Sequence, residues 1–173
     1  LRQAGRNRDE GGDTALTGRV AESVLHDWLS HAYFKAPPPK SLDRNNFDAR
    51  ALEGSSIADG AATLAAFTAH AIARAREHLP DEPLMWIIAG GGRHNRAIMQ
   101  GLAGIVQHAV VPAEAIGLDG DSLEAEAWAY LAVRSLRRLP ITFPGTTGVT
   151  QPLTGGVLAR PSALPSRAND NDV

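Results

Sequence analysis

The sequence predicts an α/β fold in which helices outnumber strands. Two short apolar runs of strand length, "LMWIIAG" at 84–90 and "AVV" at 109–111, lie between longer stretches whose apolar residues recur at helical spacing. Strands that alternate with helices along a chain are typical of a sheet layered with helices. The 173 residues are enough for one domain with an apolar core.

The composition indicates a soluble globular chain and excludes several classes of function. Hydrophobic residues make up 43% of the chain and charged residues 21%, with a formal net charge of −2. Without a basic excess we expect no nucleic-acid partner. The sequence has no cysteine, which excludes disulfides and thiolate metal sites and is consistent with a cytoplasmic location. No apolar run approaches the length of a membrane span, so we expect no membrane partner.

The first long helix is expected over residues 17–34, with Thr17 as its N-cap. The prolines of "PPPK" at 37–40 should end it, because proline cannot continue a helix. Residues 1–15 and 41–52 are expected to be loops, the second with a short helical turn. The apolar residues spaced for the inner face of this helix are Val20, Val24, Leu25, Trp28, Leu29 and Ala32.

The second long helix is expected over residues 56–79. Ser56 and Asp59 have the spacing of a capping box at its start. Its many alanines should allow another helix to approach closely. The residues spaced for its inner face are Ile57, Ala61, Leu64, Ala65, Thr68, Ile72 and Ala75.

The remaining chain should contain two helices and an irregular end. Helical spacing predicts helices over 95–107 and 121–138, with Asp121 and Glu124 as a second cap-like pair. The apolar run at 84–90 should be a buried strand, since it is bounded by Pro83 and Gly90. Residues 139–160 should be loops with one short strand near "GGVLA" at 155–159. The tail 162–173 is expected to be disordered.

Three consecutive glycines, Gly90, Gly91 and Gly92, lie between the first predicted strand and the helix that follows it. Such a loop exposes peptide N–H groups at the positive end of the helix, where an anionic or nucleotide ligand can lie against bare backbone. Ligands of α/β proteins often bind at this edge of the sheet. The alternative is a tight turn that binds nothing.

The glycines fit neither of the two common nucleotide motifs. No GxxxxGK[ST] pattern occurs, which excludes a Walker-type loop. The dinucleotide pattern GxGxxG would need glycine at position 95, where the chain has Asn95. Glu114 follows the second strand and could imitate the ribose-binding acid of such a site, so a dinucleotide-binding fragment stays an alternative.

Other polar residues have both a functional and a structural interpretation. Glu124 begins a predicted helix beside Trp128 and Leu131, where it could orient a substrate hydroxyl or a water molecule, or simply cap the helix. Lys40 could meet a phosphate or a sugar carboxylate from its stiff loop, or be solvated. The six histidines show no metal-ligand spacing. Only His94 draws interest, because it follows the glycines.

Several stretches, taken in order, resemble the carboxyl-terminal half of the anhydro-N-acetylmuramic acid kinase family. The resemblance extends from about Arg8 to Pro161, and the ordered set is specific although each motif alone is weak. The stretches are "DEGGDTALTGRV", "FKAPPPKSLDRNNF", "WIIAGGGRHNRAIMQGL", "GLDGDSLEAEAWAYLA", "LPITFPGTTGVTQP" and "GGVLARP".

This resemblance implies a fold and a reaction. The family belongs with the sugar kinases, actin and the heat-shock ATPases, which close two ribonuclease-H-like lobes over ATP. Residues 1–161 would be the second lobe, helix-rich with a small mixed sheet. The implied reaction uses ATP, Mg²⁺ and water to open 1,6-anhydro-N-acetylmuramic acid and phosphorylate it at O6. The product, N-acetylmuramic acid 6-phosphate, is recovered in cell-wall recycling.

The resemblance also implies roles for particular residues. Gly90, Gly91 and Gly92 match the glycine motif beside the nucleotide, and Asn95 matches the asparagine of that motif and should cap the next helix. Glu124 matches a glutamate that positions sugar or water. Arg93 replaces a commoner small residue and would alter the rim of the nucleotide site.

The chain departs from the family pattern in two ways. Lys40 and Arg44 lie in "PPKSLDRN", where the family has "PPKSTGRE", and Asn45 replaces its glutamate. The phosphate loop "GTSxDG" and the general-base aspartate of "FDTGPGN" do not occur in the sequence.

We therefore expect this chain to need the family's amino-terminal lobe and to be inactive as a kinase alone. A non-catalytic remnant that binds a nucleotide or a partner is the alternative. A lone lobe would expose an apolar cleft wall, so a homodimer is also expected.

Overall fold

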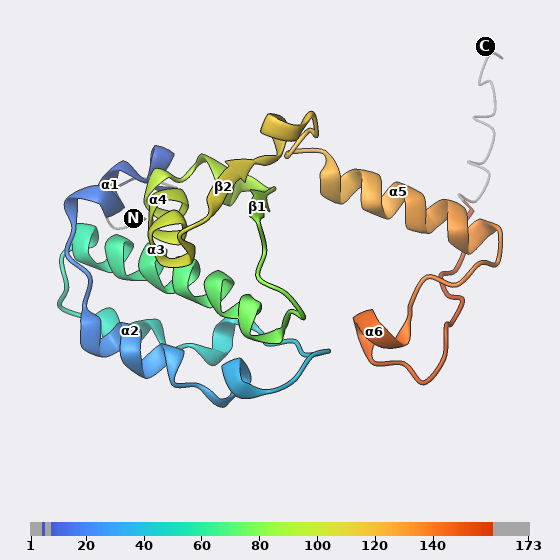
Figure 1. The fold of residues 1–173 in the computed structure, drawn as a ribbon, viewed down its shortest axis with the longest axis horizontal. Coiled ribbons are helices and arrows are strands. Elements are labelled where there is room, and N and C mark those ends of the chain that lie inside the picture. The colour runs from blue at the N-terminus through green and yellow to red at the C-terminus, as the bar shows by residue number, and fades with distance from the viewer. Residues whose placement is uncertain (1–4, 6–7, 161–173) are drawn as a thin grey trace, which may run out of the picture. The chain divides into compact units, whose positions relative to one another are not determined.

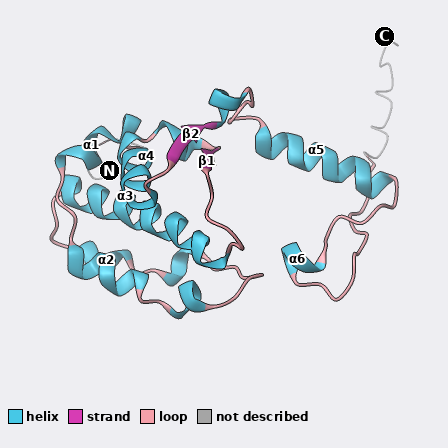
Figure 2. Cartoon of the chain, in the orientation of Figure 1, coloured by secondary structure: helices cyan, strands magenta, loops and turns pink. Residues whose placement is uncertain are grey.

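The computed structural model describes Gly5 and residues 8–160 (Figure 1). Its contacts divide the chain into two units, Leu1–Trp128 and Ala129–Val173. Helices predominate, and Figure 2 shows the strands within the first unit. The prediction of a helix-rich α/β chain is confirmed. The expected tail 162–173 lies outside the described residues.

The sheet of the first unit has two parallel strands. Strand β1 (Met85–Ile88) pairs with β2 (Ala109–Pro112), with Met85 opposite Ala109 and Ile88 opposite Pro112. Helix α4 (Arg96–Val106) connects them. The strands lie where they were predicted, but in the described chain the sheet is purely parallel rather than mixed. The expected third strand at 155–159 does not form.

One face of this sheet packs on two helices. Helix α3 (Ile57–Ala73), continued by a 3₁₀ turn Arg74–His78, lies beside α4 (Figure 1). The prediction of a buried strand is wrong: Trp86 and Ile88 are only partly buried against the helices, and Met85 and Ile87 on the other face are 43% exposed. The shared core consists of Ala69, Ala73, Leu102 and Val106, packed against Ile72, Trp86, Ile88, Ile105 and Val110.

Helix α3 begins as predicted but turns a different face inward. Ser56 Oγ accepts a hydrogen bond from Asp59 N over 3.0 Å. Ile57 and Leu64, expected inside, are exposed, as is Ala75. Small residues lie inside because α4 comes close: a Cβ on Gly101 would lie 3.3 Å from Ala69 Cβ. The residues of α3 that are buried are Ala62, Thr63, Ala65, Ala69 and Ala73.

The single helix predicted for residues 17–34 does not form. Its place is taken by α2 (Glu22–Leu29) and a 3₁₀ turn Ala32–Lys35, and a separate helix α1 (Asp13–Thr17) ends where the predicted helix should begin. Thr17 is therefore not an N-cap, and Ala32 is exposed. The expected loop at 1–15 contains a 3₁₀ turn Glu10–Gly12 and the start of α1.

Contacts with α3 explain this difference. A Cβ on Gly18 would overlap the backbone of Ala58. The chain beyond it bonds to α3 instead of continuing the helix: Arg19 N donates to Asp59 over 2.7 Å and Ala21 N to Thr63 Oγ1 over 2.9 Å. The predicted core residues Leu25, Trp28 and Leu29 are buried.

The loop after "PPPK" contains two 3₁₀ turns, Arg44–Asn46 and Ala49–Leu52, where the sequence predicted one short helical turn. Phe47 lies between them and stacks edge-on against Phe67 of α3, with ring centroids 4.8 Å apart. This contact attaches the loop to α3.

Helix α5 (Leu123–Leu136) begins in the first unit and continues into the second. Its start is capped by Asp119, whose Oδ1 accepts from Asp121 N over 2.9 Å and from Ser122 N over 3.3 Å. The predicted Asp121–Glu124 cap is therefore wrong, because the Asp121 carboxylate is used elsewhere.

The second unit contains the rest of α5 and α6 (Pro144–Thr147). Thr142 and Leu153 form an isolated antiparallel bridge. Residues 155–159 are irregular, and Gly155 O accepts from Ser135 Oγ over 2.5 Å.

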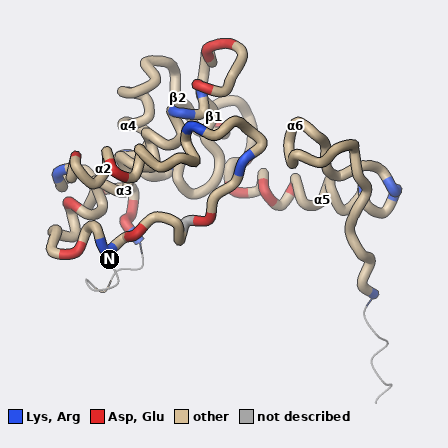
Figure 3. Tube along the Cα trace, turned by 90° about the horizontal axis from the view of Figure 1, so that it is seen from below, with Lys and Arg blue, Asp and Glu red and all other residues tan. Residues whose placement is uncertain are grey.

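Figure 3 shows acidic and basic residues interspersed along the trace. Of the helices in the described chain, none combines the length and the apolarity that a membrane crossing requires.

Candidate functional site

The three glycines form an open loop between β1 and α4. Gly90 has φ 73° and ψ 179°, a conformation that a residue with a side chain rarely adopts. A Cβ on Gly90, Gly91 or Gly92 would have no protein atom within 4 Å. Packing therefore does not require glycine at 91 and 92, which favours the hypothesis that a ligand lies there.

Part of this backbone is already hydrogen-bonded. Gly90 N donates to Gly120 O over 2.9 Å, so its N–H is not available to a ligand. Gly91 and Gly92 begin a 3₁₀ turn, Gly91–His94, and the first N–H groups of a helical turn have no partner within it. The backbone amides open to a ligand are therefore those of Gly91 and Gly92, whereas the sequence predicted open amides at all three glycines.

Asn95 caps α4, as expected. Its Oδ1 accepts from Ile98 N over 3.1 Å. Gly12 approaches this cap so closely that a Cβ there would lie 2.9 Å from Asn95 Cγ. The segment before α1 is thereby held against the start of α4.

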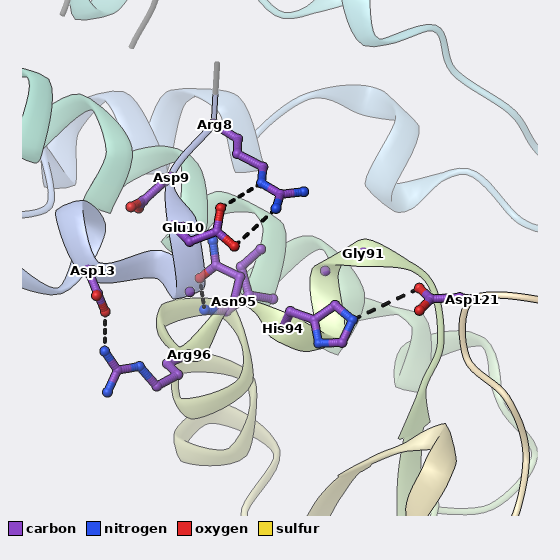
Figure 4. A pocket seen from close by; sticks show the side chains of 12 residues that line it. Arg8, Asp9, Glu10, Asp13, Gly91, His94, Asn95, Arg96 and Asp121 are labelled. Atoms are coloured by element: carbon purple, nitrogen blue, oxygen red, sulfur yellow. Dashed lines mark hydrogen bonds and ion pairs between the residues drawn. The ribbon is translucent and has the colours of Figure 1, made fainter. Parts of the chain in front are cut away.

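A cavity of about 1010 Å³ lies between these two segments. Figure 4 shows residues 8–13 facing the glycine loop, with Asn95 between them. Glu124 is not among its lining residues. The residues that line it are Arg8, Asp9, Glu10, Gly11, Asp13, Gly91, Gly92, His94, Asn95, Arg96, Ile98 and Asp121.

The sequence did not reveal the contribution of residues 8–13. Asp9 gives this segment its shape, because its carboxylate accepts from Thr14 N over 2.8 Å and from Ala15 N over 2.9 Å. The run "DEGGD" at 9–13 was the only available signal, and it was interpreted as a loop.

The cavity lining carries four carboxylates and two guanidinium groups. Glu10 pairs with Arg8 over 2.7 Å, and Asp13 pairs with Arg96. Asp121 Oδ1 lies 3.9 Å from His94 Nε2. The lining is therefore acidic overall.

Arg93 lies beneath the glycine loop, not on its rim as the resemblance implied. Its side chain is only 3% exposed. Nη1 donates to Gly90 O over 2.9 Å and to Asp121 Oδ1 over 2.8 Å. Nε and Nη2 reach Glu114 Oε1 over 2.9 Å and 2.8 Å. Arg93 therefore joins the glycine loop to the segments that precede α5.

This network shifts the acidity of its members. The hydrogen bonds from Arg93 lower the pKa of Glu114 and of Asp121 below their usual values, and the two carboxylates raise the pKa of Arg93. Glu114 also accepts from Gly120 N over 3.2 Å. Because Glu114 is bound to Arg93 and Gly120, the dinucleotide interpretation loses its free ribose-binding acid.

Glu124 lies in the first turn of α5 and is exposed. Within the described chain its side chain makes no hydrogen bond or ion pair, and its role in positioning sugar or water stays a prediction. No group of three or more His, Asp or Glu side chains suited to a metal ion occurs among the described residues.

Lys40 is structural rather than solvated. Its Nζ donates to Tyr33 O over 2.9 Å and to Phe34 O over 3.2 Å, and it lies 2.9 Å from His78 Nε2. An ammonium group can only donate, so His78 accepts at Nε2. Both interpretations of Lys40 made from the sequence, a ligand contact and a solvated side chain, are replaced by this attachment to the end of α3. Arg44 begins the 3₁₀ turn Arg44–Asn46.

Comparisons with known proteins agree with the resemblance. A sequence model of the family described as anhydro-N-acetylmuramic acid kinase matches residues 1–161. The anhydro-N-acetylmuramic acid kinase of Rhodospirillum rubrum is 51% identical over 155 residues, which cover 90% of this chain and 41% of that protein. The kinase of the same name from Caulobacter vibrioides is 54% identical over 148 residues, covering 86% of this chain and 40% of that protein.

A third relative with this name, from Rhizorhabdus wittichii, is 51% identical over 161 residues, which cover 93% of this chain and 44% of that protein. The chain thus spans less than half the length of the curated relatives it matches, although the match covers most of the chain itself. This chain belongs to the anhydro-N-acetylmuramic acid kinase family.

Proposed function

We propose that the chain forms the second, ribonuclease-H-like lobe of an ATP-dependent kinase for 1,6-anhydro-N-acetylmuramic acid. In this proposal the cavity beside the glycine loop binds the adenosine end of ATP. The observation that carries it is the open backbone of Gly91 and Gly92, located where β1 ends and α4 begins. The relatives carry the name of this kinase, which supplies the substrate class.

The charge of the cavity favours the nucleoside over the triphosphate. Four carboxylates against two guanidinium groups would repel a polyphosphate, whereas adenine and ribose are uncharged and rich in hydrogen-bonding groups. The phosphates would then extend toward the "GTSxDG" loop that the resemblance places in the first lobe. We assign no Mg²⁺ ligand to this chain.

Glu124 is the proposed contact to sugar or water. It is exposed and has no partner within the described chain, so its carboxylate is available to orient a hydroxyl. The general base and the phosphate loop, which the resemblance implies, would come from outside these 173 residues. The chain alone is accordingly proposed to be inactive, and phosphorylated sugar formed by the pure chain would contradict this.

The outer face of the sheet supports the two-lobe proposal. Parallel strands are ordinarily covered on both faces, yet Met85 and Ile87 are exposed opposite the helical layer. In a complete kinase, further polypeptide would cover them. In the isolated chain these exposed apolar residues favour self-association. Sedimentation velocity should detect a dimer of the wild-type chain and a monomer of Ile87→Asp.

Binding of ADP tests the nucleotide site directly. Gly91→Val should fold, because a Cβ at this position has no protein atom within 4 Å, and its side chain should occupy the space of the ligand. We expect it to weaken ADP binding at least about tenfold, the loss of one good contact. Gly104→Val is the matched control, since a Cβ at Gly104 also meets open space and this residue does not line the cavity. Equal affinity of wild type and Gly91→Val would refute the proposed site. NMR shifts of the amides of Gly91 and Gly92 would report binding even at millimolar affinity.

A further inference from the structure

We infer that Asp121 accepts the ribose hydroxyls of the bound nucleoside, and that the buried Arg93 is the positioning residue that holds Asp121 in place. This role rests on the proposed adenosine site. It concerns the Arg93–Asp121 pair of this chain.

Asp121 differs from the other carboxylates of the cavity. Asp9 is bound to backbone N–H groups of α1, and Glu10 is held from both oxygens by the exposed Arg8. Asp13 pairs with Arg96, also at the surface. In the described part of the chain, Asp121 is the only one of these four carboxylates that pairs with an arginine whose side chain is buried.

The geometry leaves one side of the Asp121 carboxylate open. Its contacts with Arg93 Nη1 at 2.8 Å and with His94 Nε2 at 3.9 Å both fall on Oδ1. No contact to Oδ2 occurs among the described residues, and the side chain is 73% exposed. A carboxylate can accept two hydrogen bonds side by side, which matches the two neighbouring hydroxyls of a ribose.

Arg93 is suited to hold this carboxylate without touching the ligand. Its guanidinium is fixed from three directions, by Glu114, by Gly90 O and by Asp121. The same group therefore sets the position of the glycine loop and of Asp121. The lowered pKa of Asp121 supports this role, since an ionised carboxylate accepts from both hydroxyls at neutral pH.

The test compares two probes, adenosine and 2′,3′-dideoxyadenosine, which share the base and differ in the hydroxyls. Binding to the 173-residue chain is measured by titration calorimetry or by NMR shifts. Because a hydrogen bond to a charged group is strong, we expect wild type to prefer adenosine by about tenfold. Asp121→Ala should reduce that preference to about twofold or less while keeping its affinity for dideoxyadenosine.

Arg93→Ala should abolish the same preference and leave the affinity for dideoxyadenosine within about threefold of wild type. The double variant Arg93→Ala/Asp121→Ala should have the same preference for adenosine over dideoxyadenosine as Asp121→Ala, because the two residues act through one contact. Arg50→Ala is the matched control, since it breaks a pair with Asp48 that does not line the cavity, and it should retain the full preference.

Each other outcome has a definite meaning. If Arg93→Ala lowers the affinity for both nucleosides by the same factor, Arg93 is only structural and the inference is wrong. If wild type binds both probes equally, the inference fails while the adenosine site stands. If wild type binds neither, the adenosine site fails as well. Should Arg93→Ala not fold, Asp121→Ala decides alone, because the Asp121 side chain is 73% exposed and its loss leaves Arg93 bound to Glu114 and Gly90 O.

Discussion

Gly120 has no side chain at the point where Arg93 crosses it. A Cβ on Gly120 would lie 2.8 Å from both Cδ and Cζ of Arg93, closer than real Cβ contacts come. Gly120 O also accepts the hydrogen bond from Gly90 N over 2.9 Å. The glycine loop, Arg93 and Gly120 thus form one closely fitted unit, in which each part restricts the others.

The first prediction concerns this fit. Gly120→Ala should lower the free energy of unfolding by about 1–3 kcal/mol, the usual cost of overfilling a packed site. In an Arg93→Ala background the same substitution should change stability by less than about 0.5 kcal/mol, because the obstructing side chain is gone. Urea unfolding of the four proteins measures the coupling. The control is Gly104→Ala, whose Cβ meets open space and which should change the free energy of unfolding equally in wild type and in Arg93→Ala. If Gly120→Ala also has the same cost in both backgrounds, that cost does not come from Arg93.

The second prediction concerns pH. Arg93 lowers the folded-state pKa of Glu114 and Asp121, so their contribution to stability is complete above the unfolded pKa of about 4 and is lost as the pH falls through the lower folded values. Wild type should therefore lose stability more steeply than Arg93→Ala below about pH 4. Urea unfolding from neutral to acidic pH measures this, and carbon NMR should show the Asp121 carboxyl titrating at higher pH in the variant. A stability difference that does not vary with pH would contradict the assigned pairing.

The sequence was sufficient for features that depend on local chemistry. The apolar runs placed β1 and β2, and the caps Ser56 and Asn95 placed the starts of α3 and α4, because a cap is decided within one turn of helix. The glycine loop was found for the same reason: its glycines are consecutive in the chain and follow a strand.

What the sequence could not show depends on contacts between distant segments. The helix breaks after Thr17 because Gly18 lies against the backbone of Ala58. The residues next to Gly18 in the sequence give no sign of this contact. Leu64 looked like a core residue, yet the approach of α4 selects alanines for the inner face of α3. Arg93 looked like a surface residue because Glu114 and Asp121, which allow its burial, lie in other segments.

The third prediction concerns the cap of α4 beside the cavity. Asn95→Ala should lower the free energy of unfolding by about 1 kcal/mol, because Ile98 N loses its acceptor. Asn95→Asp should retain most of the stability, since aspartate caps a helix equally well and interacts favourably with the helix dipole. Thermal or urea unfolding provides the measurement. Asn45→Ala is the control, an exposed asparagine expected to change stability by less than about 0.5 kcal/mol; a cost as large as that of Asn95→Ala would remove the special role of the cap.

The fourth prediction separates stability from binding at the loop that ends in Lys40. Lys40→Met keeps the aliphatic stem but removes the donor to Tyr33 O and Phe34 O, and should lower the free energy of unfolding by about 1.5–3 kcal/mol. Lys35→Met, at an exposed position nearby, should have an effect below about 0.5 kcal/mol. Because Lys40 lies outside the cavity lining, the affinity for adenosine should be the same in both variants as in wild type. A Lys40→Met protein of normal stability and weakened adenosine binding would mean that this lysine serves the ligand rather than the fold.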